Sequence, residues 1–209
     1  MKITVIGAGN MGSAFVRQLT RAGHQVTVTS RDAVKAQQVA AANQGAVARP
    51  AAEAAVGADA IVLATGYGDA VAALESVGNL QGKIVVDITN PLTADYMGLT
   101  IGHSTSAAEE IAKAVPGAEV VKAFNTVFAQ VLNDGPNLGA NKVTVFVASD
   151  SERAKQTART LAESIGFQVV DAGSLKNARY LEPLAGLNIY LGYGAGLGTS
   201  IAPTWIRRS

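Results

Sequence analysis

A glycine-rich turn near the N-terminus constrains the fold of this chain more than any other feature. The sequence GAGNMG, residues 7–12, follows the apolar run Lys2–Ile6 and opens a stretch with helical spacing. In such a turn the first glycine permits a sharp bend, the second lets the backbone approach a pyrophosphate, and the third allows close helix–strand packing. The helix N-terminus offers free N–H groups to the phosphates. The motif predicts dinucleotide binding, with a turn kept for packing alone as the alternative. The glycines with these roles are Gly7, Gly9 and Gly12.

Short β-rich runs alternate with helical stretches along the chain. Most runs are continuous in Val and Ile, which is typical of strands buried on both faces of a parallel sheet. This alternation favours an α/β fold with a Rossmann-type, doubly wound and mostly parallel sheet. The expected strands are Lys2–Ile6, Gln25–Thr29, Ala60–Ala64, Lys83–Ile88, Val120–Phe124, Val143–Ala148, Gln168–Asp171 and a weaker Ala46–Ala48. The expected helices lie within residues 10–23, 32–43, 106–115 and 149–166.

Composition excludes several classes of function. The 209 residues carry a formal net charge of +1 with no long basic run, which disfavours a nucleic-acid partner. The chain has no cysteine, which excludes disulfides and thiolate chemistry, and no metal-ligand spacing occurs. No apolar stretch reaches the roughly 18 residues of a membrane helix, and the N-terminal apolar run is too short for a signal peptide. We therefore expect a cytoplasmic protein without a membrane, metal or nucleic-acid partner.

The sequence TSRD at the end of the second expected strand bears on cofactor choice. Proteins that prefer NAD place Asp or Glu there to bind the ribose 2′-OH. Here Thr29, Ser30 and Arg31 occupy this place, and the latter two side chains suit a 2′-phosphate. Asp32 is expected to cap the following helix, and Lys35 adds a positive charge one turn on. The pattern favours NADP, with NAD or mixed use as the alternative.

Further polar residues follow the other expected strands at the edge where a cofactor binds. Thr65, Gly66 and Tyr67 are expected to line the nicotinamide ribose. Asn90 and Pro91 hold a loop near the nicotinamide or form an ordinary turn.

Two polar residues follow the strand near residue 122. Asn125 and Thr126 lie where the nicotinamide and a second substrate meet, and we expect them to orient the reacting rings; local turn capping is the alternative. His24 is expected at the surface, away from the cofactor. His103 is either catalytic or, by the favoured interpretation, a surface residue.

Residues 176–209 depart from the strand–helix pattern. They are rich in Gly, Leu and Tyr and too apolar for a free tail. We divide the chain into a dinucleotide-binding domain, residues 1–175, and a small C-terminal helical extension, residues 176–209. The extension packs on the domain or on a second subunit, or also forms a wall of the substrate pocket.

Four segments in order resemble the family of NADPH-dependent coenzyme F420 reductases (F420H2:NADP oxidoreductases). They are VIGAGNMGSAF…GHQVTVTSRD, VVDITNPL, KAFNTVFAQVL and DAGSLKNARYLEPLA. The cytosolic reductase domain of the six-transmembrane ferric reductases is similar and shares an AFNT segment. The resemblance covers nearly the whole chain.

This resemblance implies an NADP-binding Rossmann domain in a homodimer, which transfers a hydride between the nicotinamide and a deazaflavin or flavin ring. Gly7, Gly9, Asn10, Met11 and Gly12 match the pyrophosphate turn of the family. Ser30 and Arg31 match the 2′-phosphate contacts, although Asp32 stands where the family often has a second basic residue. Asn125 and Thr126 match the segment beside the nicotinamide. Archaeal deazaflavin reductases carry a different residue at the Asn position, so the acceptor stays open between F420, FMN, FAD and another small molecule.

Three other functions share the N-terminal dinucleotide-binding motif. A flavin-mediated ferric reductase and an NADP(H)-sensing module without turnover both fit the same motifs. A dehydrogenase of the β-hydroxyacid or imino-acid reductase type needs a long helical C-terminal domain, and the roughly 35 residues after the last expected strand are too few.

Overall fold

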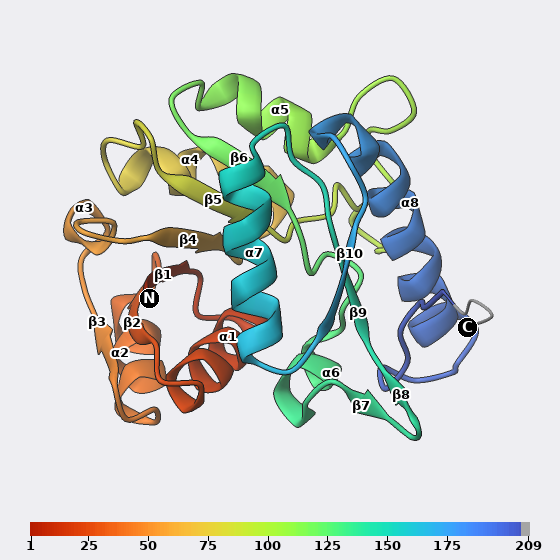
Figure 1. Cartoon of the computed structure of the whole chain (residues 1–209), viewed down its shortest axis with the longest axis horizontal. Helices are drawn as coiled ribbons and strands as arrows, with labels where there is room; N and C mark the ends of the chain where they lie inside the picture. The colour runs from red at the N-terminus through yellow and green to blue at the C-terminus, as the bar shows by residue number, and fades with distance from the viewer. Residues whose placement is uncertain (206–209) are drawn as a thin grey trace.

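Six parallel strands form the central sheet of the protein (Figure 1). The computed structural model describes residues 1–205. The strand order is β3-β2-β1-β4-β5-β6, in which the chain winds outward in both directions from β1. The bounds are β1 Lys2–Ile6, β2 Gln25–Thr29, β3 Ala46–Ala48, β4 Ala60–Leu63, β5 Ile84–Asp87 and β6 Glu119–Lys122.

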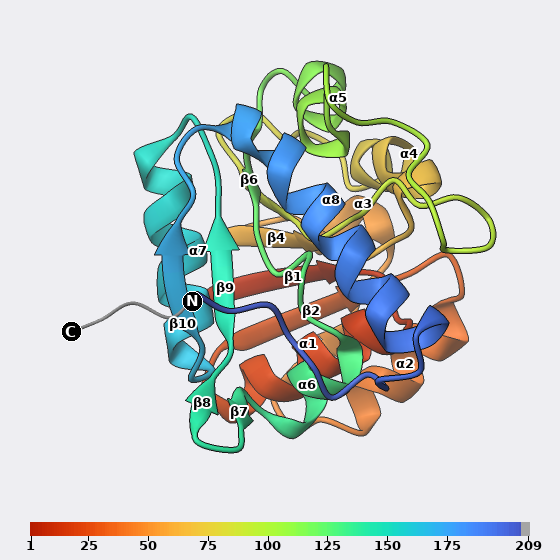
Figure 2. The same ribbon diagram turned by 90° about the vertical axis from the view of Figure 1, so that its right-hand side faces the viewer.

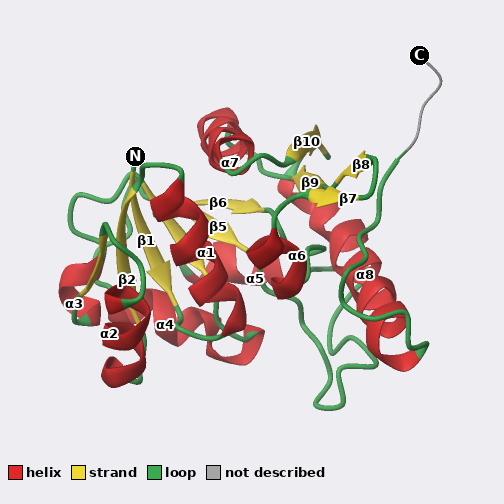
Figure 3. Cartoon of the chain, turned by 90° about the horizontal axis from the view of Figure 1, so that it is seen from below, coloured by secondary structure: helices red, strands yellow, loops and turns green. Residues whose placement is uncertain are grey.

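Helices cover both faces of this sheet. On one face the helices are α1 (Asn10–Arg21), α2 (Ala33–Ala41), α6 (Ala129–Asp134) and α7 (Glu152–Ser164), whose buried side chains join one apolar cluster. On the other face they are α3 (Ala51–Ala54), α4 (Ala70–Ser76) and α5 (Ala107–Ala114), which belong to a second cluster. Figure 1 shows α4 and α5 on one side of the strands and α1 and α2 on the other, and Figure 3 looks onto the face that carries α1, α2 and α6. The predicted doubly wound α/β fold is therefore confirmed.

The last two predicted strands lie outside the central sheet. β9 (Thr144–Val147) and β10 (Gln168–Asp171) form a separate parallel pair, linked to β6 by one antiparallel bridge between Lys122 and Ala148. Phe124 has a φ of 57°, which ends extended backbone, so β6 stops at Lys122 instead of running to Phe124 as predicted. The chain then turns back through α6 and an unpredicted hairpin of β7 (Asn137–Leu138) and β8 (Asn141–Lys142).

Local sequence signals explain the helix ends. The Asp32 carboxylate accepts the backbone N–H of Lys35 at 3.0 Å and caps α2, as predicted. Ser151 caps α7 in the same way, through the N–H of Ala154 at 3.1 Å. Gly166 follows α7 with a φ of 91°, which a helix cannot continue.

The C-terminal segment adds one long helix. After a 3₁₀ turn (Leu175–Asn177), α8 (Ala178–Ile189) crosses beside β9 and leads into a π-helical turn (Tyr190–Gly194), as Figure 2 shows. Leu181 of α8 packs with Phe146 and Ala148 near β9. The division at residue 175 stays a prediction, and residues 206–209 of the extension lie outside the described residues. Within residues 1–205, no helix has the length and apolar character needed to cross a membrane.

Candidate functional site

The carboxyl ends of the parallel strands meet at one edge of the sheet. Ile6 of β1 pairs with Thr29 of β2 and with Leu63 of β4, while Asp87 of β5 pairs with Leu63 and with Lys122 of β6. The loops that follow these strands therefore lie side by side. They carry almost all the residues that the sequence suggests for the site, and a ligand of an open α/β sheet binds at this edge.

One cavity of about 590 Å³ lies at the outer part of this edge, over β1, β2 and β4. Eight of the predicted cofactor residues line it. They are Gly7, Gly9, Thr29, Ser30, Arg31, Lys35, Thr65 and Gly66.

The three motif glycines differ in their surroundings. A Cβ on Gly7 or Gly12 would overlap backbone atoms, of Ala64 in the first case and of Gly7 in the second. A Cβ on Gly9 would meet nothing within 4 Å. Gly7 and Gly12 are thus required for packing of the turn, whereas Gly9 leaves open space beside the N-terminus of α1, where a phosphate group fits.

Charged side chains gather at the mouth of this cavity. The guanidinium of Arg31 donates hydrogen bonds of 3.0 and 2.9 Å to the two carboxylate oxygens of Asp69. Lys35 lines the same cavity, and the Ser30 hydroxyl is engaged locally with the backbone of Asp32 at 3.0 Å. Arg31 is thus in the predicted place but holds an acidic partner that the sequence did not suggest.

Two further cavities, of about 270 and 700 Å³, continue along the edge over β4, β5 and β6. They share lining residues and so adjoin each other. The shared residues are Met11, Ile88, Asn90, Leu92 and Tyr96. Among the described residues that line these two cavities, none has a charged side chain. Predicted site residues that line one or both are Asn10, Met11, Thr65, Gly66, Tyr67, Asn90, Asn125 and Thr126.

Two amide side chains, Asn90 and Asn125, are locked together at these cavities. The Asn125 Nδ2 donates to Asn90 Oδ1 at 3.0 Å and to the carbonyl of Leu181 at 2.9 Å, and Asn90 Nδ2 donates to the Asn125 carbonyl at 2.8 Å. The Asn125 Oδ1, Thr65 Oγ1 and Thr89 Oγ1 atoms are buried without a hydrogen-bond partner. Buried polar atoms are normally paired, so three unpaired ones in residues that line these cavities are unusual.

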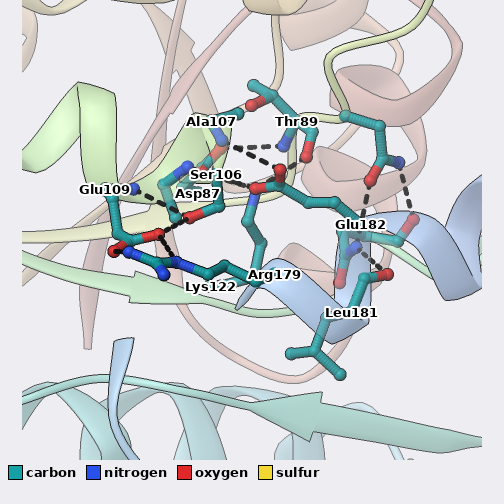
Figure 4. A network of polar contacts seen from close by, with 12 residues as sticks. Asp87, Thr89, Ser106, Ala107, Glu109, Lys122, Arg179, Leu181 and Glu182 are labelled. Carbon is teal, nitrogen blue, oxygen red and sulfur yellow. Dashed lines mark hydrogen bonds and ion pairs between the residues drawn. The ribbon is translucent and has the colours of Figure 1, made fainter. Parts of the chain in front are cut away.

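A buried ion network, drawn in Figure 4, adjoins the larger of these two cavities through Thr89. The Lys122 ammonium lies 2.7 Å from Asp87 Oδ2 and 2.9 Å from Glu182 Oε1, and it donates to the Thr89 carbonyl at 2.7 Å. All three charged side chains are at most 1% exposed. The other Asp87 oxygen accepts the Thr89 N–H at 2.8 Å, so this aspartate braces the strand end.

Glu182 ties the C-terminal helix to this network. Its two oxygens accept the N–H groups of Ala107 and Ala108 at 2.8 and 3.1 Å, at the N-terminus of α5. Burial by itself lowers the pKa of Lys122, but the negative charges of Asp87 and Glu182 outweigh burial and raise it, so the ammonium stays charged. The sequence does not indicate a partner for Lys122. The available signals of a buried ion pair were a lysine in an apolar strand and a glutamate in an apolar helix.

The other titratable candidates from the sequence are Tyr67, His103 and His24. Burial, followed by the charges of Glu110, Glu182 and Asp87, raises the pKa of Tyr67, so its phenol stays protonated at neutral pH. His103 is exposed and lines a separate depression beside α8. His24 is bonded to Ser164 Oγ at 2.9 Å, close to the N-terminus of the chain.

Pro91 does not line any of the three cavities of this edge. Its carbonyl instead accepts the Thr100 N–H at 2.7 Å and shapes the loop after β5.

The glycine turn, the Rossmann-type sheet and the cavities along its carboxyl edge together define a dinucleotide-binding α/β protein.

Comparison with known proteins gives the family. The family described as "NADP oxidoreductase coenzyme F420-dependent" matches residues 2–91. An F420-dependent NADP reductase of Methanothermobacter marburgensis is 34% identical over 208 aligned positions, which cover 91% of this chain and 92% of that protein. A solved structure from Arthrobacter sp. FB24, titled as a candidate F420-dependent NADP reductase, has a TM-score of 0.90 and 32% identity and covers 99% of this chain and 100% of its own. The chain belongs to this family and is an NADP-dependent oxidoreductase.

A second group of relatives is longer than this chain. The metalloreductase STEAP3 of Rattus norvegicus is 30% identical over 184 positions, which cover 88% of this chain but 36% of the rat protein. The chain therefore spans about a third of the length of that relative. The resemblances to F420 reductases and to ferric reductases that the sequence suggested are both confirmed.

Proposed function

We propose that this protein transfers a hydride between NADP(H) and the deazaflavin ring of coenzyme F420. In the reducing direction, C4 of the reduced nicotinamide gives a hydride to C5 of the deazaflavin. The ring N1 takes a proton from water, which leaves NADP⁺ and the reduced deazaflavin. Support comes from the family and from the archaeal relative, whose name states this pair of substrates.

One observation carries the proposal: among the described residues that line the two adjoining cavities over β4, β5 and β6, none has a charged side chain. Hydride transfer between two stacked rings needs positioning and exclusion of water rather than an acid–base pair. Amides, hydroxyls and apolar side chains supply this. In our proposal Gly9 and Arg31 hold the diphosphate and 2′-phosphate, while Asn125 and Thr126 orient the rings.

A flavin, FMN or FAD, is the second acceptor that we propose to test. The similarity to the rat metalloreductase over 88% of the chain favours a flavin. The AFNT segment with Asn125 and Thr126, which resembles that of ferric reductase domains, also favours it. A flavin would accept the same hydride at N5. Onward electron transfer to ferric iron would make the protein a flavin-mediated ferric reductase, and NADP(H) sensing without turnover is the non-enzymatic alternative.

We further propose that the protein acts in the cytoplasm on a small-molecule acceptor and forms a homodimer. Several large apolar side chains at the C-terminal end are exposed, which supports a subunit contact there. They are Tyr180, Leu187, Tyr190, Tyr193, Leu197 and Trp205. Light scattering at two protein concentrations tests the dimer.

The test of the function is an acceptor panel. The protein is mixed with NADPH and, in separate reactions, F420, FMN, FAD and a ferric chelate, and the loss of NADPH absorbance is followed. Oxidation with F420 supports the proposal, whereas oxidation only with a flavin or with flavin plus iron supports the second candidate. Tight NADPH binding without turnover on any acceptor would favour a sensor and refute both.

A further inference from the structure

We propose that Asp69 is a specificity-determining residue that competes with the cofactor 2′-phosphate for Arg31. It thereby narrows the preference of this protein for NADPH over NADH. The inference rests on the proposed cofactor site, in which Arg31 receives the 2′-phosphate.

The two side chains meet across the mouth of the outer cavity. Arg31 follows β2, whereas Asp69 ends the 3₁₀ turn Tyr67–Asp69 after β4, and both line the cavity together with Gly9 and Ser30. The guanidinium and carboxylate form two hydrogen bonds, of 3.0 and 2.9 Å. This bidentate geometry is the one that Arg uses for a phosphate, so one guanidinium edge serves two competing anions.

Nothing in the packing requires this pair. The Arg31 side chain is 86% exposed and that of Asp69 is 47% exposed, so the pair contributes little to the stability of the fold. The partner that Arg31 holds is therefore free to be replaced when an anion enters the cavity.

The charge balance of the cavity points the same way. Its lining includes two cations, Arg31 and Lys35, and two carboxylates, Asp32 and Asp69. The Asp32 carboxylate is committed to capping α2 through the N–H of Lys35. Asp69 is thus the carboxylate that faces the guanidinium, and a 2′-phosphate must displace it or bind beside it as a like charge.

The same carboxylate affects the two cofactors in opposite ways. A 2′-phosphate is repelled by Asp69, whereas a ribose 2′-hydroxyl can donate a hydrogen bond to a carboxylate. Removal of this charge should therefore tighten NADPH binding and leave NADH binding equal or weaker.

The experiment measures dissociation constants of NADPH and NADH by fluorescence titration, without any acceptor. In Asp69→Asn, the NADPH constant should fall roughly threefold to tenfold, while the NADH constant stays equal or rises. The matched control is Glu75→Gln, which removes a negative charge from the exposed surface of α4 outside the cavity. It should leave both constants unchanged.

A double variant tests whether Asp69 affects NADPH binding through Arg31. In an Arg31→Ala background, Asp69→Asn should tighten NADPH less than it does in the wild type, because the competition for the guanidinium is gone. The inference is overturned when Asp69→Asn weakens NADPH, changes both cofactors equally, or acts no differently from Glu75→Gln. Failure of the wild type to bind NADPH at all would instead refute the proposed cofactor site.

Discussion

Replacement of Lys122 by methionine probes the buried ion network behind the site. The variant keeps an unbranched side chain but removes the ammonium that lies between Asp87 and Glu182. Asp87 retains the Thr89 N–H, and Glu182 retains two N–H groups of α5. Both carboxylates nevertheless lose their buried counter-charge.

The expected cost is large. Removal of one partner from a buried ion pair costs about 3–5 kcal/mol, because it leaves an uncompensated charge. For a chain of this length, each 1 kcal/mol lowers Tm by roughly 2–4 °C. Lys122→Met should therefore lower Tm by about 6–20 °C, working from those two ranges.

The ammonium stays charged over the pH range of this test. The folded pKa of Lys122 is raised, so its contribution to stability is fully present below about pH 10 and is lost only above it. This contribution is thus the same at about pH 5 and at about pH 8, so titration of Lys122 should not change the loss of Tm between these two pH values.

Thermal unfolding followed by circular dichroism at both pH values measures this. Lys113→Met, which removes an exposed lysine paired with Glu110 on α5, is the matched control and should unfold near the wild-type temperature. The double variant Lys122→Met/Glu182→Gln should recover part of the loss, because one of the facing charges is gone. A Tm within about 2 °C of the wild type at both pH values would refute the reasoning.

Three further predictions concern the cofactor and the acceptor. Arg31→Ala should weaken NADPH binding at least about tenfold and NADH binding little, by titration; an equal loss of both contradicts the 2′-phosphate role. Gly9→Ala should keep the wild-type Tm yet weaken NADPH binding, whereas Gly12→Ala should lower Tm as well, because only the latter Cβ meets backbone. Asn125→Ala should lower kcat about tenfold with a smaller change in the NADPH dissociation constant, and an unchanged kcat would remove this residue from the site.

The strands and the glycine turn could be predicted because their signals are local. Short β-rich runs marked the six strands of the central sheet to within a residue or two, with the weaker run Ala46–Ala48 among them. Asp32 indicated where α2 begins, and the order of strands and helices indicated which loops share an edge. Most proposed site residues therefore fell on the observed cavities.

Other features depend on contacts between distant segments. Lys122 meets Asp87 from the neighbouring strand and Glu182 from the last helix, and Arg31 meets Asp69 from another loop. No local pattern encodes such pairs. The separation of β9 and β10 from the main sheet likewise follows from the backbone reversal after β6. There Phe124 adopts a positive φ of 57°, which a bulky side chain does not favour.

The most direct test of the account follows the transferred hydrogen itself. NADPH carrying deuterium at C4 is incubated with the protein and F420, and the reduced deazaflavin is analysed by mass spectrometry. Each face of the nicotinamide is labelled in a separate reaction. Direct transfer predicts that one labelled face delivers deuterium to the deazaflavin carbon. Oxidation of NADPH with no deuterium in the deazaflavin from either face, or no oxidation despite NADPH binding, would contradict the proposed hydride transfer.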